Sequence, residues 1–159
     1  MKAVLDACVL YPTFLRHILI HVAEAGRSTP IWSARLLEEW RRAAERNGGA
    51  TDAAFAEMEA ADLTRRFPEA LVPPGEEAPL WLPDPGDIHV LATAIAGQAD
   101  TILTLNLRDF PKAELAPHGV VARAPDAVLM ELWMADAAAV EAAVTAAHQA
   151  AQTHHGAPI

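Results

Sequence analysis

The sequence predicts an α/β fold in which a central, mostly parallel sheet is flanked by helices in three layers. Short apolar runs with strand character alternate along the chain with longer segments of helical periodicity. This alternation is typical of a parallel sheet covered on both faces. No repeat, linker or low-complexity stretch divides the chain, so we expect a single domain over residues 1–151 and a polar, frayed tail at 152–159.

The start of the chain predicts a strand, a helix and a second extended segment. Residues 2–6 are a short apolar run that ends on a carboxylate, as a buried strand would. Pro12 opens a helix whose apolar residues recur at the helical period, and Gly26 ends it. A short extended piece follows at 30–32. Ser33 then has the residue type and the place of a helix N-cap.

Helices dominate the next part of the chain. The helix that begins at Ser33 is expected to run to about Arg46, where Asn-Gly-Gly at 47–49 ends it. A further helix is expected from Thr51 to the Phe67-Pro68 break. A second short strand is predicted at 71–72.

The remaining elements alternate again. Residues 73–87 are rich in Pro, Gly and acidic residues and predict a loop. Residues 88–97 are nearly all apolar and predict a helix buried on most sides. A strand is expected at 101–105 and a weaker one at 119–122. Two helices complete the chain, at about 125–134 and 136–151.

The net charge limits the classes of function. The chain has 21 acidic and 12 basic residues, a formal net charge of −9. Proteins that simply coat nucleic acid are usually basic, because they neutralise phosphates. An enzyme whose acids hold metal ions stays compatible with this charge, because bound cations offset the local negative field. A basic partner chain would also supply positive charge.

The cysteine content and the hydrophobic segments bear on location. Cys8 is the single cysteine, so no disulfide can form within one chain, which fits a reducing compartment. The first ten residues are too short and too acidic for a signal peptide, and no segment reaches membrane-spanning length. We therefore expect a cytoplasmic protein.

Two acids in the first half of the chain are candidate site residues. Parallel sheets place their sites beyond the carboxyl ends of strands. Asp6 stands there in an apolar stretch, where an unpaired charge is costly; a helix cap or turn is the alternative interpretation. Glu39 lies at the border of the apolar stripe of its helix and can reach over the sheet edge, although exposed helix glutamates are common.

Further acids lie in loops of the second half. With Asp84 as N-cap and Asp87 as the acid at position N3 of a capping box, both residues would be explained without a site. The alternative is that Asp87 meets a metal at the strand ends. Asp109 follows the strand at 101–105, where a turn or a site role fits. Taken together with Asp6 and Glu39, these acids predict an oxygen cluster for Mg²⁺ or Mn²⁺, which would act on a phosphodiester.

Other catalytic templates are absent from the sequence. There is no phosphate-binding glycine loop, no nucleophile elbow, no dinucleotide-binding motif and no zinc spacing. His89 in the apolar helix is predicted to be a hydrogen-bonded core residue. Cys8 is predicted to be a small core residue, since no histidine partner is evident.

Four ordered blocks of the sequence resemble the PIN-domain family, and specifically its VapC-like toxins. The blocks are VLDACVLYP (4–12), WSARLLEEW (32–40), DPGDIHVLATAIAGQAD (84–100) and TILTLNLRDFP (101–111). The resemblance covers essentially the whole chain. It implies a PIN-like fold and a metal-dependent endoribonuclease that acts as the toxin of a type II toxin–antitoxin pair. Such proteins commonly form homodimers and are neutralised by a small antitoxin.

The resemblance also implies which residues form the site. The metal ligands would be four acids: Asp6, Glu39, Asp87 and Asp109. The assignments of Asp84 and Asp87 could be exchanged, and the fourth acid is the most variable in the family. The polar pair that supports the site would be Thr104 and Asn106. Candidates to guide RNA phosphates are Arg16, Arg108 and Lys112, each with ordinary surface cation as the alternative.

Two other function classes stay open. A catalytically silent PIN-like module would only dimerise or bind a partner; acids at all four family positions argue against it. Exposed Trp133 and Met134 would permit a dimer. A receiver-like phospho-acceptor domain would need a lysine at the end of a late strand, whereas Lys112 lies beyond a proline in a loop.

Overall fold

Four parallel strands form the centre of the computed structural model, which describes the backbone of residues 1–154 and the side chains of residues 1–150. In chain order the strands are β1 (Lys2–Leu5), β2 (Thr29–Ile31), β3 (Thr101–Leu103) and β4 (Val121–Arg123). In space their order is β2-β1-β3-β4, and every pairing is parallel. The carboxyl ends of all four strands therefore meet at one edge of the sheet.

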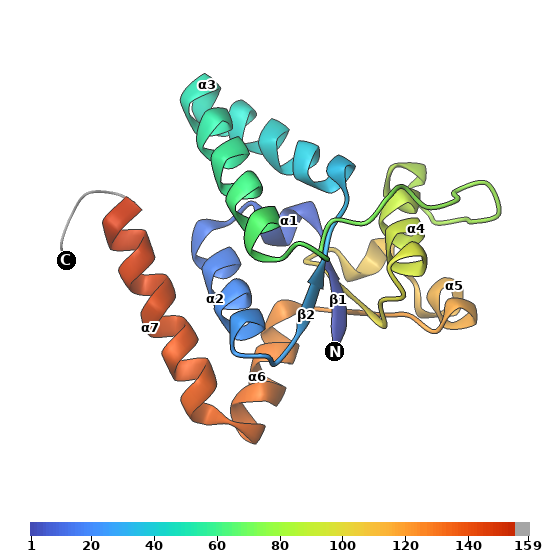
Figure 1. The fold of residues 1–159 in the computed structure, drawn as a ribbon. Helices are drawn as coiled ribbons and strands as arrows, with labels where there is room; N and C mark the ends of the chain where they lie inside the picture. Colours follow the sequence, from blue (N-terminus) through green and yellow to red (C-terminus); the bar gives the residue numbers. More distant parts are fainter. Residues whose placement is uncertain (155–159) are drawn as a thin grey trace.

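Helices cover both faces of this sheet, which confirms the predicted three-layer α/β fold (Figure 1). On one side α4 packs against β1 and β3, and α5 packs against β4; on the other, α2 packs against β2 and carries α7. The helices are α1 (Ala7–Leu10), α2 (Thr13–Glu24), α3 (Ala34–Arg66), α4 (Ile88–Ala96), α5 (Lys112–Leu115), α6 (Pro125–Ala135) and α7 (Ala137–His154). Three single-turn 3-10 helices are η1 (Pro85–Asp87), η2 (Leu107–Asp109) and η3 (Ala116–His118).

The central strands are buried on both faces, as their apolar sequences require. Val4 of β1 stands opposite Ile31 of β2 and Ile102 of β3, and all three side chains are almost fully buried. A strand with neighbours on both edges and helices on both faces has no solvated side, so its sequence is a continuous apolar run. The α2, α6 and α7 helices form a second apolar cluster around Ile18 and Val22.

The α3 helix consists of two helical limbs that meet at Gly49, which confirms the two helices predicted for this region. Ser33 is its N-cap, as expected, and its hydroxyl accepts a hydrogen bond from the Leu36 amide at 3.2 Å. The break lies within the predicted Asn-Gly-Gly signal at 47–49 and is confined to the last residue of that signal. Only Gly49 leaves the helical conformation, with φ 74° and ψ −163°, and the second limb doubles back beside the first (Figure 1). A single glycine in this conformation is enough to redirect the chain.

Other differences from the sequence prediction are local. The strand expected at 71–72 is a single bridge between Leu71 and Trp32. The strand expected at 101–105 ends at Leu103, and the one expected at 119–122 lies at Val121–Arg123. The α1 helix was not predicted, because one turn is too short to show a helical period.

The C-terminal end extends the helical part of the chain. The α7 helix continues through His154, three residues into the predicted tail, and the rest of that tail lies outside the described residues. Over the part of the chain that the structure describes, no helix is both long enough and apolar enough to span a membrane.

Replacing Gly49 by Ala should destabilise the fold. Its φ and ψ lie in a region that is essentially restricted to glycine, so a Cβ atom there costs about 1–3 kcal/mol. Urea denaturation of the two proteins measures this difference in the free energy of unfolding. Gly48→Ala is the matched control, since the atoms its Cβ meets belong to the flexible, exposed side chain of Asp52. Equal losses in both variants would contradict a special role for Gly49.

Candidate functional site

The order of the strands creates a switch point at the carboxyl edge of the sheet. From β1 the chain continues to β2 on one side, whereas β3, on the other side of β1, leads on to β4. Connections therefore diverge between β1 and β3, and such a point leaves a crevice at the strand ends in open α/β sheets. Asp6 directly follows β1, and Thr104 directly follows β3.

Asp6 and Thr104 meet at this point. Asp6 is 7% exposed; its Oδ1 accepts a hydrogen bond from the Ala7 amide at 2.8 Å, and its Oδ2 accepts one from Thr104 Oγ1 at 2.9 Å. Asp6 is thus both the N-cap of α1 and a carboxylate at the carboxyl end of β1. Burial raises the pKa of Asp6; the hydrogen bonds from Thr104 and Ala7 oppose this shift, and the charge of Glu39 adds to it.

Thr104 and Cys8 hold the neighbouring loop against this carboxylate. Thr104 is fully buried, and its Oγ1 also accepts a hydrogen bond from the backbone amide of Asn106 at 3.0 Å. Asn106 itself is exposed. Thr104 therefore contacts Asp6 directly, whereas Asn106 is connected through its backbone.

Cys8 is more than the small core residue that the sequence suggested. It is half-buried; its Sγ lies 3.5 Å from Asp6 Oδ2 and 3.6 Å from Thr104 Oγ1, and it accepts from the Leu105 amide at 3.4 Å. Burial, followed by the charge of Asp6, raises the pKa of Cys8 to about 11, so the group is a thiol at neutral pH. Its place two residues after Asp6, in the first turn of α1, is the sequence signal that could have revealed this contact.

Asp84 and Asp87 have separate tasks. Asp84 caps η1, with its Oδ1 accepting from the Gly86 amide at 2.8 Å. Asp87 occupies the N-cap position of α4 but makes no capping hydrogen bond with its side chain. The capping interpretation therefore describes Asp84 and leaves the carboxylate of Asp87 available.

Asp87 lies in a strongly negative environment. Burial raises its pKa to about 6, and the charges of Asp84, Asp6, Asp109 and Glu39 contribute to this rise in that order. Carboxylates from the end of β1, from α3, from η1 and from η2 therefore share one electrostatic neighbourhood, although they are up to about a hundred positions apart in sequence. This convergence is the main contribution of the tertiary structure to the candidate site.

Glu39 projects from α3 toward α4. Its Oε2 lies 3.1 Å from Nε2 of His89, a residue that is 5% exposed. His89 is therefore a hydrogen-bonded core residue, as the sequence predicted. Its partner is one of the candidate site acids, and no sequence pattern indicated this pairing.

The donor set fits a hard divalent cation in chemical type. Carboxylate oxygens are the ligands that Mg²⁺ and Mn²⁺ prefer, and a cation would offset the repulsion that raises the pKa of Asp87. In the present side-chain arrangement, no three His, Cys, Asp or Glu residues of the described chain are grouped closely enough to hold a metal ion. Ligation would therefore require side-chain rotation.

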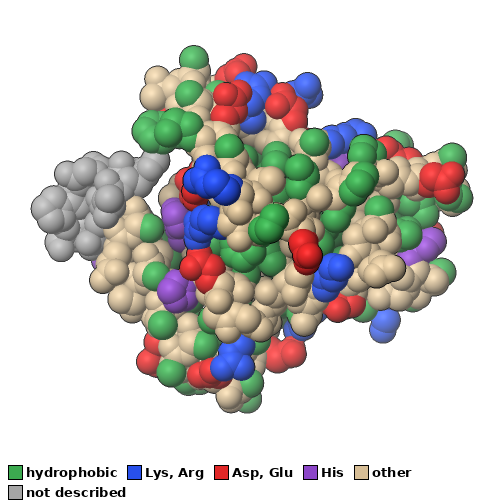
Figure 2. Space-filling model, viewed as in Figure 1, with side chains coloured by type: hydrophobic (Ala, Val, Ile, Leu, Met, Phe, Trp, Pro, Cys, Tyr) green, Lys and Arg blue, Asp and Glu red, His purple; other side chains and the backbone are tan. Residues whose placement is uncertain are grey.

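The three candidate phosphate guides occupy different environments. Arg108 in η2 and Lys112 at the start of α5 lie on the segment that carries Asp109, and both are exposed. On the face drawn in Figure 2, acidic and basic side chains are interspersed and form no continuous basic tract.

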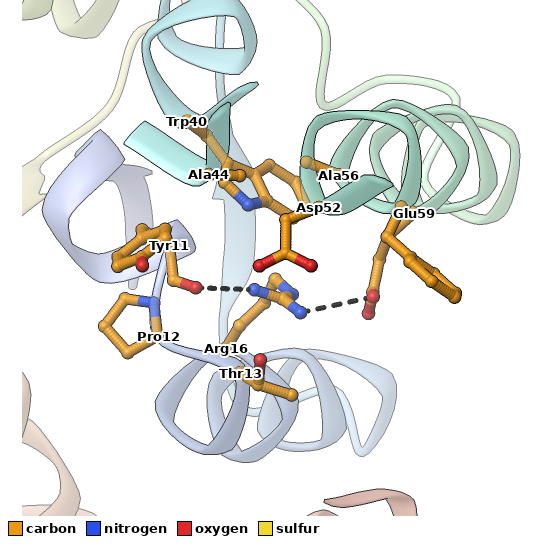
Figure 3. Close-up of a pocket in the computed structure, with 10 residues that line it drawn as sticks. Tyr11, Pro12, Thr13, Arg16, Trp40, Ala44, Asp52, Ala56 and Glu59 are labelled. Atoms are coloured by element: carbon orange, nitrogen blue, oxygen red, sulfur yellow. Dashed lines mark hydrogen bonds and ion pairs between the residues drawn. The ribbon is translucent and has the colours of Figure 1, made fainter. Parts of the chain in front are cut away.

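Arg16 has a structural role that does not support its assignment as a guide. It is 5% exposed, and its guanidinium donates to Leu10 O at 2.6 Å and Tyr11 O at 3.0 Å. It also pairs with Glu59 at 3.2 Å and lies over the Trp40 ring, 4.6 Å from the centroid (Figure 3). The surrounding cavity, about 390 Å³, is lined by none of the four candidate acids.

The titration of Asp87 gives a test of this electrostatic neighbourhood. Its pKa is raised from 3.8 to about 6, so the protonated form favours the folded state. The resulting stability is fully present below pH 3.8 and is lost as the pH rises through about 6. Asp84→Asn removes a charge and keeps a capping oxygen, so it should lower the pKa of Asp87. Carboxyl ¹³C NMR of the metal-free protein measures this; an unchanged pKa would contradict the assigned coupling.

Comparison with known families agrees with this geometry. A PIN-domain family model matches residues 2–108, a segment that contains Asp6, Glu39 and Asp87 and stops one residue before Asp109. The resemblance to the PIN-domain family, which the sequence suggested for essentially the whole chain, is thus shown for residues 2–108. No curated protein and no solved structure gives a significant match. Because the match covers well over half of the chain, the protein belongs to the PIN-domain family, whose members are generally nucleases.

Proposed function

We propose that this protein is a metal-dependent endoribonuclease that serves as the toxin of a type II toxin–antitoxin pair. The observation that carries the proposal is the electrostatic coupling of Asp87 with Asp6, Glu39 and Asp109, where Asp6 lies at the switch point between β1 and β3. Membership of the PIN-domain family supports nuclease activity in general. The all-carboxylate donor set supports Mg²⁺ or Mn²⁺ as the cofactor.

Each residue of the proposed site has a distinct task. Asp6, Glu39 and Asp87 would ligate the ion, and Asp109 would hold it through water or assist a second one. When bound, the ion supplies an activated water and offsets charge on the phosphodiester. Thr104 keeps Asp6 oriented, because its hydroxyl donates to the oxygen that is not used in capping. Asn106 holds the Thr104 hydroxyl in place through its backbone amide.

RNA is the proposed substrate, and the surface charge affects how it would bind. With a net charge of −9, the protein gains little from general attraction to phosphates. Arg108 and Lys112 lie on either side of Asp109 on the same segment and are exposed, which supports a role for them in guiding a phosphate toward the acids. Specificity would then come from local contacts rather than from a basic surface.

A cognate antitoxin and a second copy of the chain are the proposed partners. The acidic surface favours a basic antitoxin by charge complementarity. Met130, Trp133 and Met134 are exposed and lie three and four residues apart, hence on one face of α6. This apolar face is suited to a homodimer contact.

A silent PIN-like module is the second candidate. It is favoured by the spacing of the acids, no three of which are grouped for a metal ion within the described residues. Such a module would bind metal weakly or not at all and would cleave no RNA. Activity and metal titration therefore separate the two candidates.

Asp6→Asn should abolish Mn²⁺-dependent cleavage of a mixed RNA pool. The amide keeps an acceptor for the Ala7 amide but removes the charge that the ion requires, so a decrease of more than about 100-fold is expected. Asp100→Asn is the matched control, because this aspartate precedes β3 and bonds Lys2 and Thr101 at the opposite edge of the sheet. Circular dichroism would verify that both variants fold.

The outcomes of this comparison are decisive. Cleavage by the parent and by Asp100→Asn, absent in Asp6→Asn and abolished by a chelator, supports the nuclease and its first ligand together. Equal cleavage by Asp6→Asn rejects the assignment. Metal binding by the parent without cleavage of any RNA favours the silent module.

Replacing both Arg108 and Lys112 by Ala should weaken RNA binding without removing catalysis. KM should rise several-fold while kcat stays near the parent value, because neither side chain is a proposed ligand. The slope of log K against log salt should fall by about one for each phosphate that is no longer neutralised. Unchanged KM and salt dependence would show that RNA approaches by another route.

A further inference from the structure

His89 is a polar exception in an apolar helix. The side chains of Val90, Leu91, Ala92 and Ala94 in α4 are almost fully buried, and His89 is buried among them. A buried imidazole needs hydrogen-bond partners for both of its nitrogens. Within the described residues only one nitrogen has a partner: Nε2 faces Glu39 Oε2 at 3.1 Å, whereas Nδ1 is buried without one.

The two nitrogens together define the tautomer. If the proton of the neutral ring were on Nδ1, a buried N–H would lack an acceptor, and the Nε2 lone pair would face a carboxylate oxygen. With the proton on Nε2, the ring donates to Glu39, and only an acceptor lone pair is left unused. The geometry therefore favours Nε2–H donating to Glu39.

We infer that His89 is a positioning residue that aims the carboxylate of Glu39 at the metal site. This inference rests on the proposed function. The hydrogen bond joins α3, which carries Glu39, to α4, which directly follows Asp87. Glu39 is half-exposed at the end of a flexible side chain, so a buried donor on one oxygen limits its rotation and leaves the other oxygen for the ion.

A purely structural role explains His89 less well. An apolar residue at this place would avoid the unpartnered Nδ1 and would continue the apolar character of α4. A polar side chain kept in the core at a cost to packing is expected where it orients a functional group. Among the residues that the structure describes, the one hydrogen bond of the His89 ring leads to a proposed ligand.

The first test measures Mn²⁺ affinity by the EPR signal of free Mn²⁺, which does not depend on RNA cleavage. His89→Leu and His89→Asn should raise the Kd for Mn²⁺ by about 10–100-fold, as removal of an outer partner of a ligand does. His89→Gln places an amide N–H near the position of Nε2 and should restore affinity close to that of the parent. Asn is polar but too short to reach Glu39, so it separates polarity from reach.

Two further variants serve as controls. Thr93→Val removes the hydroxyl that bonds the His89 carbonyl one turn along α4, and should leave Mn²⁺ affinity unchanged. In the Glu39→Gln background, His89→Leu should produce no further decrease, because the two residues act through one interaction. Thermal unfolding of each variant verifies the fold.

A second measurement examines the metal-free protein. Long-range ¹H–¹⁵N NMR should show His89 protonated at Nε2, and Glu39→Gln should shift that nitrogen. Protonation at Nδ1 alone would overturn the inference whatever the metal does. Equal Mn²⁺ affinity in the parent and His89→Leu would overturn it while leaving the nuclease proposal standing. Failure of the parent to bind Mn²⁺ would instead overturn the proposed metal site, and the inference with it.

Discussion

The hydrogen bond between Thr104 and Asp6 is the interaction on which the edge of the sheet depends. A buried carboxylate is costly unless hydrogen bonds satisfy it, and here two oxygens are satisfied by Thr104 Oγ1 and the Ala7 amide. The first bond joins the ends of β1 and β3, and the second begins α1. The same Thr104 hydroxyl accepts from the Asn106 amide and so sets the course of the loop toward Asp109. The hydrogen bonds around the Asp6 carboxylate therefore connect the end of β1, the start of α1 and the loop that follows β3.

Around this point the molecule brings several acidic side chains into one electrostatic neighbourhood. Arg16, the most buried arginine of the described residues, is held by Leu10, Tyr11 and Glu59 in a separate cavity, and Arg41 pairs with Glu38 and Glu45 on the outer face of α3. Asp87 consequently has a raised pKa, caused first by burial and then by its acidic neighbours. Perturbed carboxylates at the switch point of a parallel sheet are characteristic of functional sites. A divalent cation is the chemically simplest way to relieve this repulsion.

The candidate acids differ in the structural hydrogen bonds that their carboxylates make. Asp84 is used in capping, Asp6 combines a cap with a place at the strand end, and Asp87 caps nothing with its side chain. Glu39 is paired with a buried imidazole. Where ordinary structural roles account for a side chain fully, as for Asp84, a catalytic role needs separate support. Where they do not, as for Asp87 and His89, the carboxylate without a capping bond or the unpartnered nitrogen is the basis of the role proposed for that residue.

The sequence by itself determined the fold class, the N-cap at Ser33, the strands and most helices, and the family blocks that include Asp6, Glu39 and Asp87. These features depend on local periodicity and on residue types at fixed spacing, which a linear chain displays directly. It predicted the helix break at 47–49 but did not reveal the contact of Cys8 with Asp6, the structural role of Arg16 or the pairing of His89 with Glu39. Those features arise from contacts between segments far apart in sequence or from a single backbone conformation. Only the tertiary structure decided them, because burial and partner geometry do not exist until the sheet brings the strand ends together.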